Sequence, residues 1–166
     1  MPVRPVIVEP DPVLSRAAAA IGALSDAARS LAVDLVDTMY ASPACVGLAA
    51  PQIGVPLRAF ALDVGGHKLA GANHGRIVMF DPVVAERSGS EVAREGCMSV
   101  PHLTCDVSRA GAVVVRGLGV DGQSLTIEAV GFEARAIQHE IDHLDGMLII
   151  DRATGPRGIF PRKIYR

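Results

Sequence analysis

Tryptophan is absent from the sequence and aromatic residues make up only 4 % of it, which argues against a base-stacking surface for single-stranded nucleic acid. No excess of one charge is present either, because 16 Lys and Arg stand against 18 Asp and Glu, a net charge of −2. Such a chain has no basic field to attract nucleic acid or anionic lipid. No apolar run approaches the roughly 18 residues that span a bilayer, and prolines and acidic residues interrupt positions 1–12, where a signal peptide needs an apolar segment. We therefore predict no nucleic-acid binding and no membrane association.

Cysteine is scarce as well. The three cysteines, Cys45, Cys97 and Cys105, are an odd and sparse set that does not suit a disulfide scaffold, so we expect the reducing cytoplasm as the compartment. What the chain does have is a 49 % apolar fraction beside 20 % charged residues, which is enough to bury a core and excludes intrinsic disorder. A length of 166 residues predicts one domain.

Hydrophobic periodicity predicts two helices. The first begins at an N-cap on Ser25 and runs to about Tyr40. The second covers residues 132–144 and stops at Gly146. Strand-like segments lie at residues 57–63, 76–84, 112–118 and 124–130, and the last two are joined as a hairpin around Asp121-Gly122.

The remaining segments are expected to be irregular. Residues 45–55 form an apolar loop rich in small side chains, and residues 65–75 form a solvated loop that contains His67 and His74. The basic tail, residues 151–166, is expected to be a surface extension with no required chemistry. The fold class that follows is α+β, with short antiparallel strands packed around a C-terminal helix.

That C-terminal helix carries His139-Glu140-Ile141-Asp142-His143, an H-E-x-x-H motif. His139 and His143 are four residues apart, so both imidazoles project from one helical face and can bind one metal ion. Glu140 lies about 100° around the helix from His139, and its carboxylate can reach a water at the metal without being a ligand. The alternative explanation is two histidines and a glutamate on a half-buried helix.

The third ligand decides the class of site. Zinc endoproteases with this motif usually take it from downstream, but neither His nor Glu follows His143. Upstream, Cys97 adjoins Gly96, whose backbone freedom lets a thiolate approach a metal. Cys105 is the rival thiol, although its strand-like surroundings favour an inert buried side chain. A Cys/His/His set leaves the open position that catalytic sites require.

A third segment, residues 47–52, reads Gly-Leu-Ala-Ala-Pro-Gln, and its small side chains allow the backbone to pass close to a bound substrate. Gln52 ends the segment with a side-chain amide able to donate a hydrogen bond to a developing oxyanion. A tightly packed loop with a glutamine that caps the core would explain the same residues without a function.

These segments resemble, in order and spacing, the three signature motifs of the peptide deformylase family, G-x-G-L-A-A-P-Q, E-G-C-L-S and H-E-x-D-H-L-x-G. They lie at residues 45–52, 95–99 and 139–146 and span most of the chain. The resemblance implies one catalytic domain over residues 1–166 that removes the N-formyl group from the initiator methionine of nascent polypeptides and releases formate. N-formyl-methionyl peptides are then the partners, and the substrate implies transient contact with the ribosome.

The resemblance also implies roles for individual residues. One divalent metal would be bound by Cys97, His139 and His143, with Fe²⁺ as the native ion and Zn²⁺, Ni²⁺ or Co²⁺ as alternatives. Glu140 would be the general acid and base, while Gln52 and the backbone N–H of Met98 would bind the oxyanion.

Further positions follow from the same motifs. The substrate-binding residues implied are Val46, Gly47, Leu48 and Gly96. Asp142 would pair with Arg109 and hold the metal helix in register. A surface aspartate and a separate surface arginine are the alternative.

The chain departs from the family pattern at several positions. Cys45 replaces the first glycine of the first motif, and Met98 replaces the usual leucine of the second. His102-Leu103-Thr104 stand where the family often has an arginine, and Arg135 stands one helical turn before His139, where an apolar pocket residue is expected.

Three other functions remain to be weighed. The departures favour a deformylase-like metallohydrolase that acts on another formyl or acyl amide as the first alternative. A binding protein without catalysis is disfavoured because the catalytic set is complete. An endoprotease is disfavoured because the downstream ligand is missing.

Overall fold

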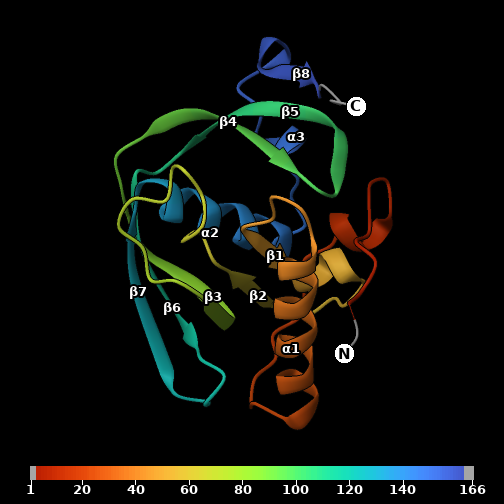
Figure 1. The fold of residues 1–166 in the computed structure, drawn as a ribbon, viewed down its shortest axis with the longest axis vertical. Helices are drawn as coiled ribbons and strands as arrows, with labels where there is room; N and C mark the ends of the chain where they lie inside the picture. Colours follow the sequence, from red (N-terminus) through yellow and green to blue (C-terminus); the bar gives the residue numbers. More distant parts are fainter. Residues whose placement is uncertain (1–2, 163–166) are drawn as a thin grey trace.

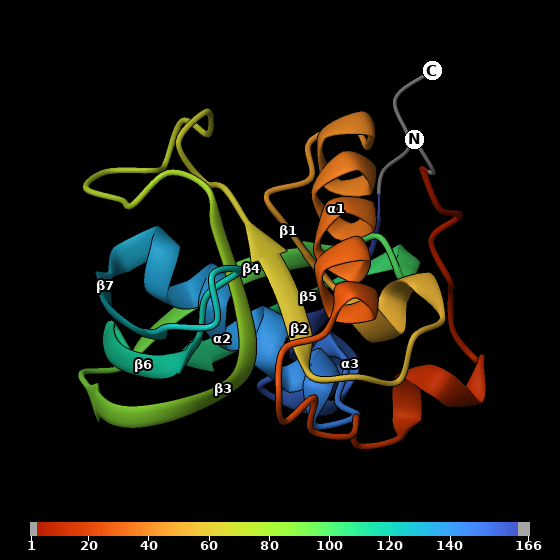
Figure 2. The ribbon, with the colours of Figure 1, turned by 90° about the horizontal axis from the view of Figure 1, so that it is seen from below.

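The computed structural model describes residues 3–162 (Figures 1 and 2). The helices are α1 (Asp26–Ala41), α2 (Gly131–Leu144) and the short α3 (Ile149–Arg152). Short 3₁₀ turns cover Pro12–Ser15, Ala50–Ile53 and Pro156–Gly158. The strands are β1 (Gly47–Ala49), β2 (Ala59–Leu62), β3 (Ile77–Ser88), β4 (Glu91–Cys97), β5 (Val100–Arg109), β6 (Ala112–Leu118), β7 (Ser124–Val130) and β8 (Ile159–Pro161). In this part of the chain no helix is both long and apolar enough to cross a bilayer.

The strands form two sheets in which every strand pair is antiparallel. One sheet has the order β1-β2-β3-β6-β7 and the other has the order β4-β5-β8. In Figure 1, α2 crosses the centre of the molecule with β4, β5 and β8 above it and the larger sheet below, while α1 stands to the side of β1 and β2. The predicted α+β class, with antiparallel strands around a C-terminal helix, is confirmed.

The larger sheet is buried on both faces where it is covered by helices. On β2, Phe60 and Leu62 pack in the cluster that contains α2, and Ala59 and Ala61 pack in the cluster that contains α1. Because successive side chains of a strand point to opposite faces, this short strand is enclosed between the two helices. The alanines leave room for α1, whose predicted N-cap is confirmed by the bond of 3.2 Å from the Ala28 N–H to the Ser25 hydroxyl.

Helix α2 ends where the sequence predicts. Gly146 adopts φ +76°, a conformation that favours glycine. A Cβ atom at this position would lie 2.8 Å from the carbonyl carbon of Arg16, so the backbone of the N-terminal segment passes directly against the turn. The helix is therefore fixed at its C-terminal end by backbone packing, one turn beyond the H-E-x-x-H motif.

The second sheet is missing from the sequence prediction. Apart from the strand-like surroundings of Cys105, no strand is predicted over residues 91–109, yet this segment forms the hairpin of β4 and β5. The expectation of a surface tail is wrong for residues 151–162, because β8 pairs with β5 and Ile159 packs against the core cluster beneath that sheet; residues 163–166 lie outside the described residues. One physical reason is that residues 91–94 of β4 are all exposed, so the strand shows little of the apolar alternation that marks a half-buried strand.

The structure confirms some of the other predicted strand boundaries and changes others. The hairpin of β6 and β7 is confirmed at residues 112–118 and 124–130. The third strand, β3, extends to Ser88 through two register shifts, the first of which includes Asp81 at φ +49°. The expected loop at residues 45–55 contains β1 and a 3₁₀ turn, because its apolar side chains pack into the core instead of facing solvent.

Candidate active site

Two elements bring together the three predicted metal ligands. Cys97 ends β4, whereas His139 and His143 lie on one face of α2. Their ligand atoms all lie within 4.8 Å of one another, and the Sγ of Cys97 is 3.4 Å from the Nε2 of His143. Cys97 and His143 are buried and His139 is half-buried, so the three donors converge in the interior rather than on the surface.

The thiol and the imidazoles of this group stabilise one another's charged forms. Burial alone would raise the pKa of the Cys97 thiol, but the adjacent imidazoles of His143 and His139 hold that pKa well below its usual value. Burial opposes the charged form of His139, yet its bonds to Cys97 and Glu95 raise its pKa well above the usual value. A thiolate beside two imidazoles is a donor set that suits Fe²⁺ or Zn²⁺. The residues therefore fit the metal that the motif implies.

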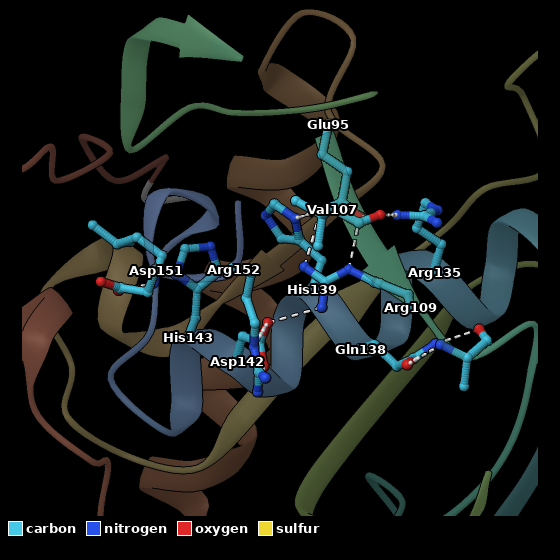
Figure 3. Close-up of polar contacts among 12 residues, drawn as sticks. Glu95, Val107, Arg109, Arg135, Gln138, His139, Asp142, His143, Asp151 and Arg152 are labelled. Carbon is cyan, nitrogen blue, oxygen red and sulfur yellow. Dashed lines mark hydrogen bonds and ion pairs between the residues drawn. The ribbon is translucent and has the colours of Figure 1, made fainter. Parts of the chain in front are cut away.

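Glu95, to which the sequence prediction gives no role, is the centre of the polar network behind the ligands (Figure 3). Its carboxylate accepts bonds from Arg109 at 2.6 and 2.9 Å and from Arg135 at 2.6 Å, and lies 2.9 Å from the Nδ1 of His139. The last contact leaves Nε2 of His139 for the metal. Glu95 and Cys97 are two residues apart on one strand and so share a face. This spacing is the signal in the sequence that could have placed Glu95 beside the metal ligands.

The expected pair between Arg109 and Asp142 is present, at 2.8 Å. Asp142 is also reached by Arg152 from α3, at 3.1 and 3.2 Å. Arg109 thus connects α2 to β4 by contacting both Asp142 and Glu95, and both of its partners are buried. This arrangement fixes the position of the helix that carries the two histidines.

Gln52 is buried and held in one orientation. Its Oε1 accepts a bond from the Ala49 N–H at 3.0 Å, and its Nε2 donates to the Ser99 hydroxyl at 3.1 Å. The hydroxyl of Ser99 donates in turn to the carbonyl of Ile7 at 2.7 Å. Nε2 of Gln52 also lies 3.7 Å from the Sγ of Cys97, so the donor side of the amide faces the ligand group.

Glu140 lies on α2 with its carboxylate against β1. A Cβ atom at Gly47 would lie 2.6 Å from its Oε1, which means that only glycine leaves room for the carboxylate here. Burial raises the pKa of Glu140, while the charges of His139 and His143 act in the opposite direction. Its Oε2 is buried and has no hydrogen-bond partner among residues 3–162.

A pocket of about 390 Å³ opens above these groups. The predicted site residues that line it are Val46, Gly47, Gln52, Gly96, Cys97, Met98, His139 and Glu140. Leu48 is 0 % exposed and packs in the core beside α1, so its side chain does not face this pocket. Met98 occupies the turn between β4 and β5 at the edge of the pocket.

Comparison with known proteins decides between the possible activities. The family model of polypeptide deformylases matches residues 3–157. The chain belongs to the polypeptide deformylase family. It is 40 % identical over 164 residues to a peptide deformylase of Syntrophobacter fumaroxidans, covering 98 % of this chain and 94 % of that protein.

Solved structures agree with this assignment. The peptide deformylase of Thermotoga maritima superposes with a TM-score of 0.84 at 33 % identity, over 93 % of this chain and 100 % of that one. A peptide deformylase of Synechococcus elongatus in complex with actinonin gives a TM-score of 0.84 at 30 % identity, over 95 % of this chain and 82 % of that one. The chain is therefore a metal-dependent hydrolase that removes the N-formyl group from nascent polypeptides. The alternative of another acyl amide is not favoured.

We expect Gly47→Ala to impair deformylation without removing the metal ligands. The added methyl group would displace the Glu140 carboxylate, and a misplacement of about 1 Å in a catalytic group can cost roughly 100-fold in rate. The measurement is kcat for formate release together with the metal content. Gly66→Ala is the control, since a Cβ atom there meets nothing within 4 Å. Equal rates for both variants would show that Glu140 has more room than the geometry indicates.

Cys45 is accommodated in this deformylase without strain at its own position. Positive φ values at non-glycine residues of the described chain occur at Ala44 and Asp81, not at Cys45. The thiol contacts the carbonyl of Gly47 at 3.1 Å. Burial, together with the nearby charge of Glu140, raises the pKa of Cys45 to about 12. The thiol is therefore protonated at neutral pH.

Alkylation tests this difference between the two thiols of the pocket. In metal-free protein at pH 7, iodoacetamide should modify Cys97 faster than Cys45, because the thiolate is the nucleophile. The rate at Cys45 should rise as the pH increases toward the pKa of about 12. Mass spectrometry of digested protein measures both sites. Rapid modification of Cys45 at pH 7 would contradict the raised pKa of this thiol.

Arg135 does not place a free charge in the deformylase pocket. Its guanidinium turns toward β4, where it contacts Glu95 and donates to the carbonyls of Val107 at 3.0 Å and Glu91 at 2.7 Å. The alkyl stem of such a side chain can still cover an apolar surface. The charge that Arg135 brings in place of an apolar residue is therefore balanced by the polar network around Glu95.

Proposed function

We propose that formyl-amide hydrolysis takes place at the base of this pocket, with one divalent metal held by Cys97, His139 and His143. The convergence of these three ligand atoms within 4.8 Å carries the proposal. When bound, the metal supplies a Lewis acid that lowers the pKa of a coordinated water to about 7 in well-studied zinc enzymes. Glu95 contacts His139, and Arg109 joins Glu95 to Asp142 on the same helix, so these residues keep the histidine donors oriented.

Glu140 is proposed as the general acid and base. Its burial raises its pKa, which brings its proton affinity closer to neutral pH than that of a free glutamate. It takes the proton of the attacking water and returns a proton to the leaving amine. The unpartnered Oε2 is the oxygen available for this exchange.

Gln52 and the backbone N–H of Met98 are proposed to bind the oxyanion. The acceptor oxygen of the Gln52 amide is occupied by the Ala49 N–H. Its NH₂ group donates one N–H to Ser99 and faces Cys97 with the same nitrogen, which leaves the second N–H for the oxyanion. Loss of one such donor typically costs about 2.7–4 kcal/mol of transition-state stabilisation.

The peptide part of the substrate is proposed to lie between two edge strands. β1 is at the edge of the larger sheet and β4 at the edge of the smaller one, and both border the pocket. Edge strands present backbone groups to which an extended peptide can add. Val46, Gly47, Leu48 and Gly96 would contribute through their backbones, which is compatible with the buried side chain of Leu48.

Four finer assignments belong to the same proposal. Fe²⁺ is the native metal, with Zn²⁺, Ni²⁺ or Co²⁺ as substitutes. The enzyme works in the cytoplasm, contacts the ribosome transiently and uses residues 1–166 as one catalytic domain. Support comes from the mixed thiolate and imidazole donor set, from the sparse cysteines and from the nascent-chain substrate.

The test is purification without oxygen, metal analysis and an assay of formate release from a formyl-Met tripeptide. We expect one metal per chain, rapid formate release and no hydrolysis of the matching acetyl-Met tripeptide. Exposure to air should inactivate the iron form, because iron-bound thiolate is sensitive to oxidation. Bound metal with negligible formate release would refute the proposal.

A further inference from the structure

The mouth of the pocket is lined by basic side chains from three separate segments. They are Lys68 in the loop between β2 and β3, Arg94 on β4 and Arg162 directly after β8. The acidic side chains in the lining are Glu95 and Glu140, and both are buried at its base. The rim therefore presents positive charge, although the whole chain has a net charge of −2.

Arg94 is already engaged. Its Nε donates to Asp106 at 2.7 Å, and its guanidinium lies 3.5 Å from the centre of the Phe160 ring. Its charge is neutralised and its position is fixed by these contacts. The two other basic side chains make no ion pair within residues 3–162.

Arg162 is delivered to the rim by the last strand. β8 pairs with β5 from Cys105 to Leu103, and the Arg162 N–H then donates to the carbonyl of His102 at 2.9 Å. The side chain reaches back to Gly96, where a Cβ atom would lie 3.5 Å from Cζ and 3.6 Å from both terminal nitrogens. The guanidinium thus lies against the backbone of β4, next to the metal ligand Cys97.

Lys68 belongs to a loop that two histidines attach to α2, through contacts that the sequence analysis does not predict. The ring of His67 stacks on Phe132, with centres 4.4 Å apart. The backbone N–H of His74 donates to Oε2 of Glu133 at 2.7 Å, and its Nδ1 lies 2.6 Å from Oε1. His67 is half-buried and His74 is exposed, so the expectation of solvated loop residues holds for His74. Both histidines nevertheless attach the loop to the first turn of α2.

We propose that Arg162 and Lys68 determine peptide specificity by binding a carboxylate side chain in the first residues after the formyl-methionine. The inference rests on the proposed function of the site. Successive Cα atoms are only about 3.8 Å apart, so a residue close to the scissile bond is within reach of a cation that borders Gly96. The carboxylate comes from a side chain because the α-carboxyl group of a polypeptide substrate is distant from its formyl group.

The test measures kcat/KM for two pairs of formyl-Met tripeptides that carry a C-terminal amide. In the first pair the second residue is Glu or Gln and the third residue is the same. In the second pair the third residue is Glu or Gln and the second residue is the same. At low ionic strength we expect the Glu peptide of at least one pair to be favoured. Arg162→Gln and Lys68→Gln should each reduce the Glu/Gln ratio by roughly two- to five-fold, as for an exposed ion pair. The loss should appear in KM rather than kcat.

Three variants separate a local contact from a general effect of charge. Arg162→Lys should retain most of the preference, and Arg162→Glu should invert it. Arg157→Gln removes an exposed cation from the same tail outside the pocket lining and should leave the Glu/Gln ratio unchanged. A matched peptide with a free α-carboxylate and no acidic side chain shows whether the chain terminus is bound instead.

The results that would refute the specificity proposal differ from those that would refute the proposed function. Failure of formate release from every peptide would refute the proposed function itself. Release from all peptides with equal Glu/Gln ratios in every variant would overturn the specificity proposal alone. A preference confined to the free α-carboxylate, or Arg162-dependent inhibition by a short RNA without any peptide preference, would also overturn it.

Discussion

Glu140→Gln should lower kcat for formate release by about 100- to 10,000-fold, the usual range for removal of a general acid–base group. The amide has nearly the same shape as the carboxylate but cannot accept the proton of the attacking water. Cys97, His139 and His143 are untouched, so the metal content should stay at that of the wild-type enzyme. A reduction in kcat of this size with full metal occupancy is the expected result.

Stability provides the second readout for the same variant. Burial raises the pKa of Glu140 and its Oε2 has no hydrogen-bond partner among the described residues, so the charged form destabilises the fold. We therefore expect metal-free Glu140→Gln to have a Tm at least equal to that of the wild type. Glu128→Gln, an exposed position on β7, is the control and should change neither kcat nor Tm. A reduced Tm in parallel with the reduced rate would indicate a structural role instead.

Glu95→Gln should destabilise the protein by about 3–5 kcal/mol, the cost of breaking a buried ion pair from one side. The change leaves the buried guanidinium groups of Arg109 and Arg135 without their shared carboxylate. It also weakens the contact that orients His139, for which a loss of roughly 10- to 100-fold in metal affinity is typical. Denaturant unfolding and chelator competition measure the two effects. Glu91→Gln removes an exposed carboxylate from the same strand and should preserve both quantities.

The dependence on pH follows from the same carboxylate. Burial would raise the pKa of Glu95, but its bonds to His139 and Arg109 and their charges hold it well below the usual range. The unfolded chain binds this proton near pH 4.3, so the contribution is complete above that pH and is lost as the pH falls toward the folded pKa. Wild-type stability should therefore fall steeply below about pH 4, with a shallower slope for Glu95→Gln. Equal slopes would contradict this role for Glu95.

The parts of the fold and site that the sequence predicts are those determined by short-range geometry. His139 and His143 share a helical face because of their spacing, and the Asp121-Gly122 turn fixes the hairpin of β6 and β7. The roles of Glu95 and Arg162 depend on which strands pair. Residues 103–105 meet residues 159–161 across a long stretch of chain, and no local pattern in residues 159–161 identifies that partner.

The position of α2 between the two sheets also has a consequence for synthesis of the protein. Strands β2, β3 and β6 precede α2 in the chain, and their apolar side chains gain that cover only after residues 131–144 have been made. A growing chain that still lacks α2 therefore exposes this surface and is prone to aggregation. The helix that carries the histidines also completes the core, so a nascent chain cannot fold stably long before its catalytic centre is assembled.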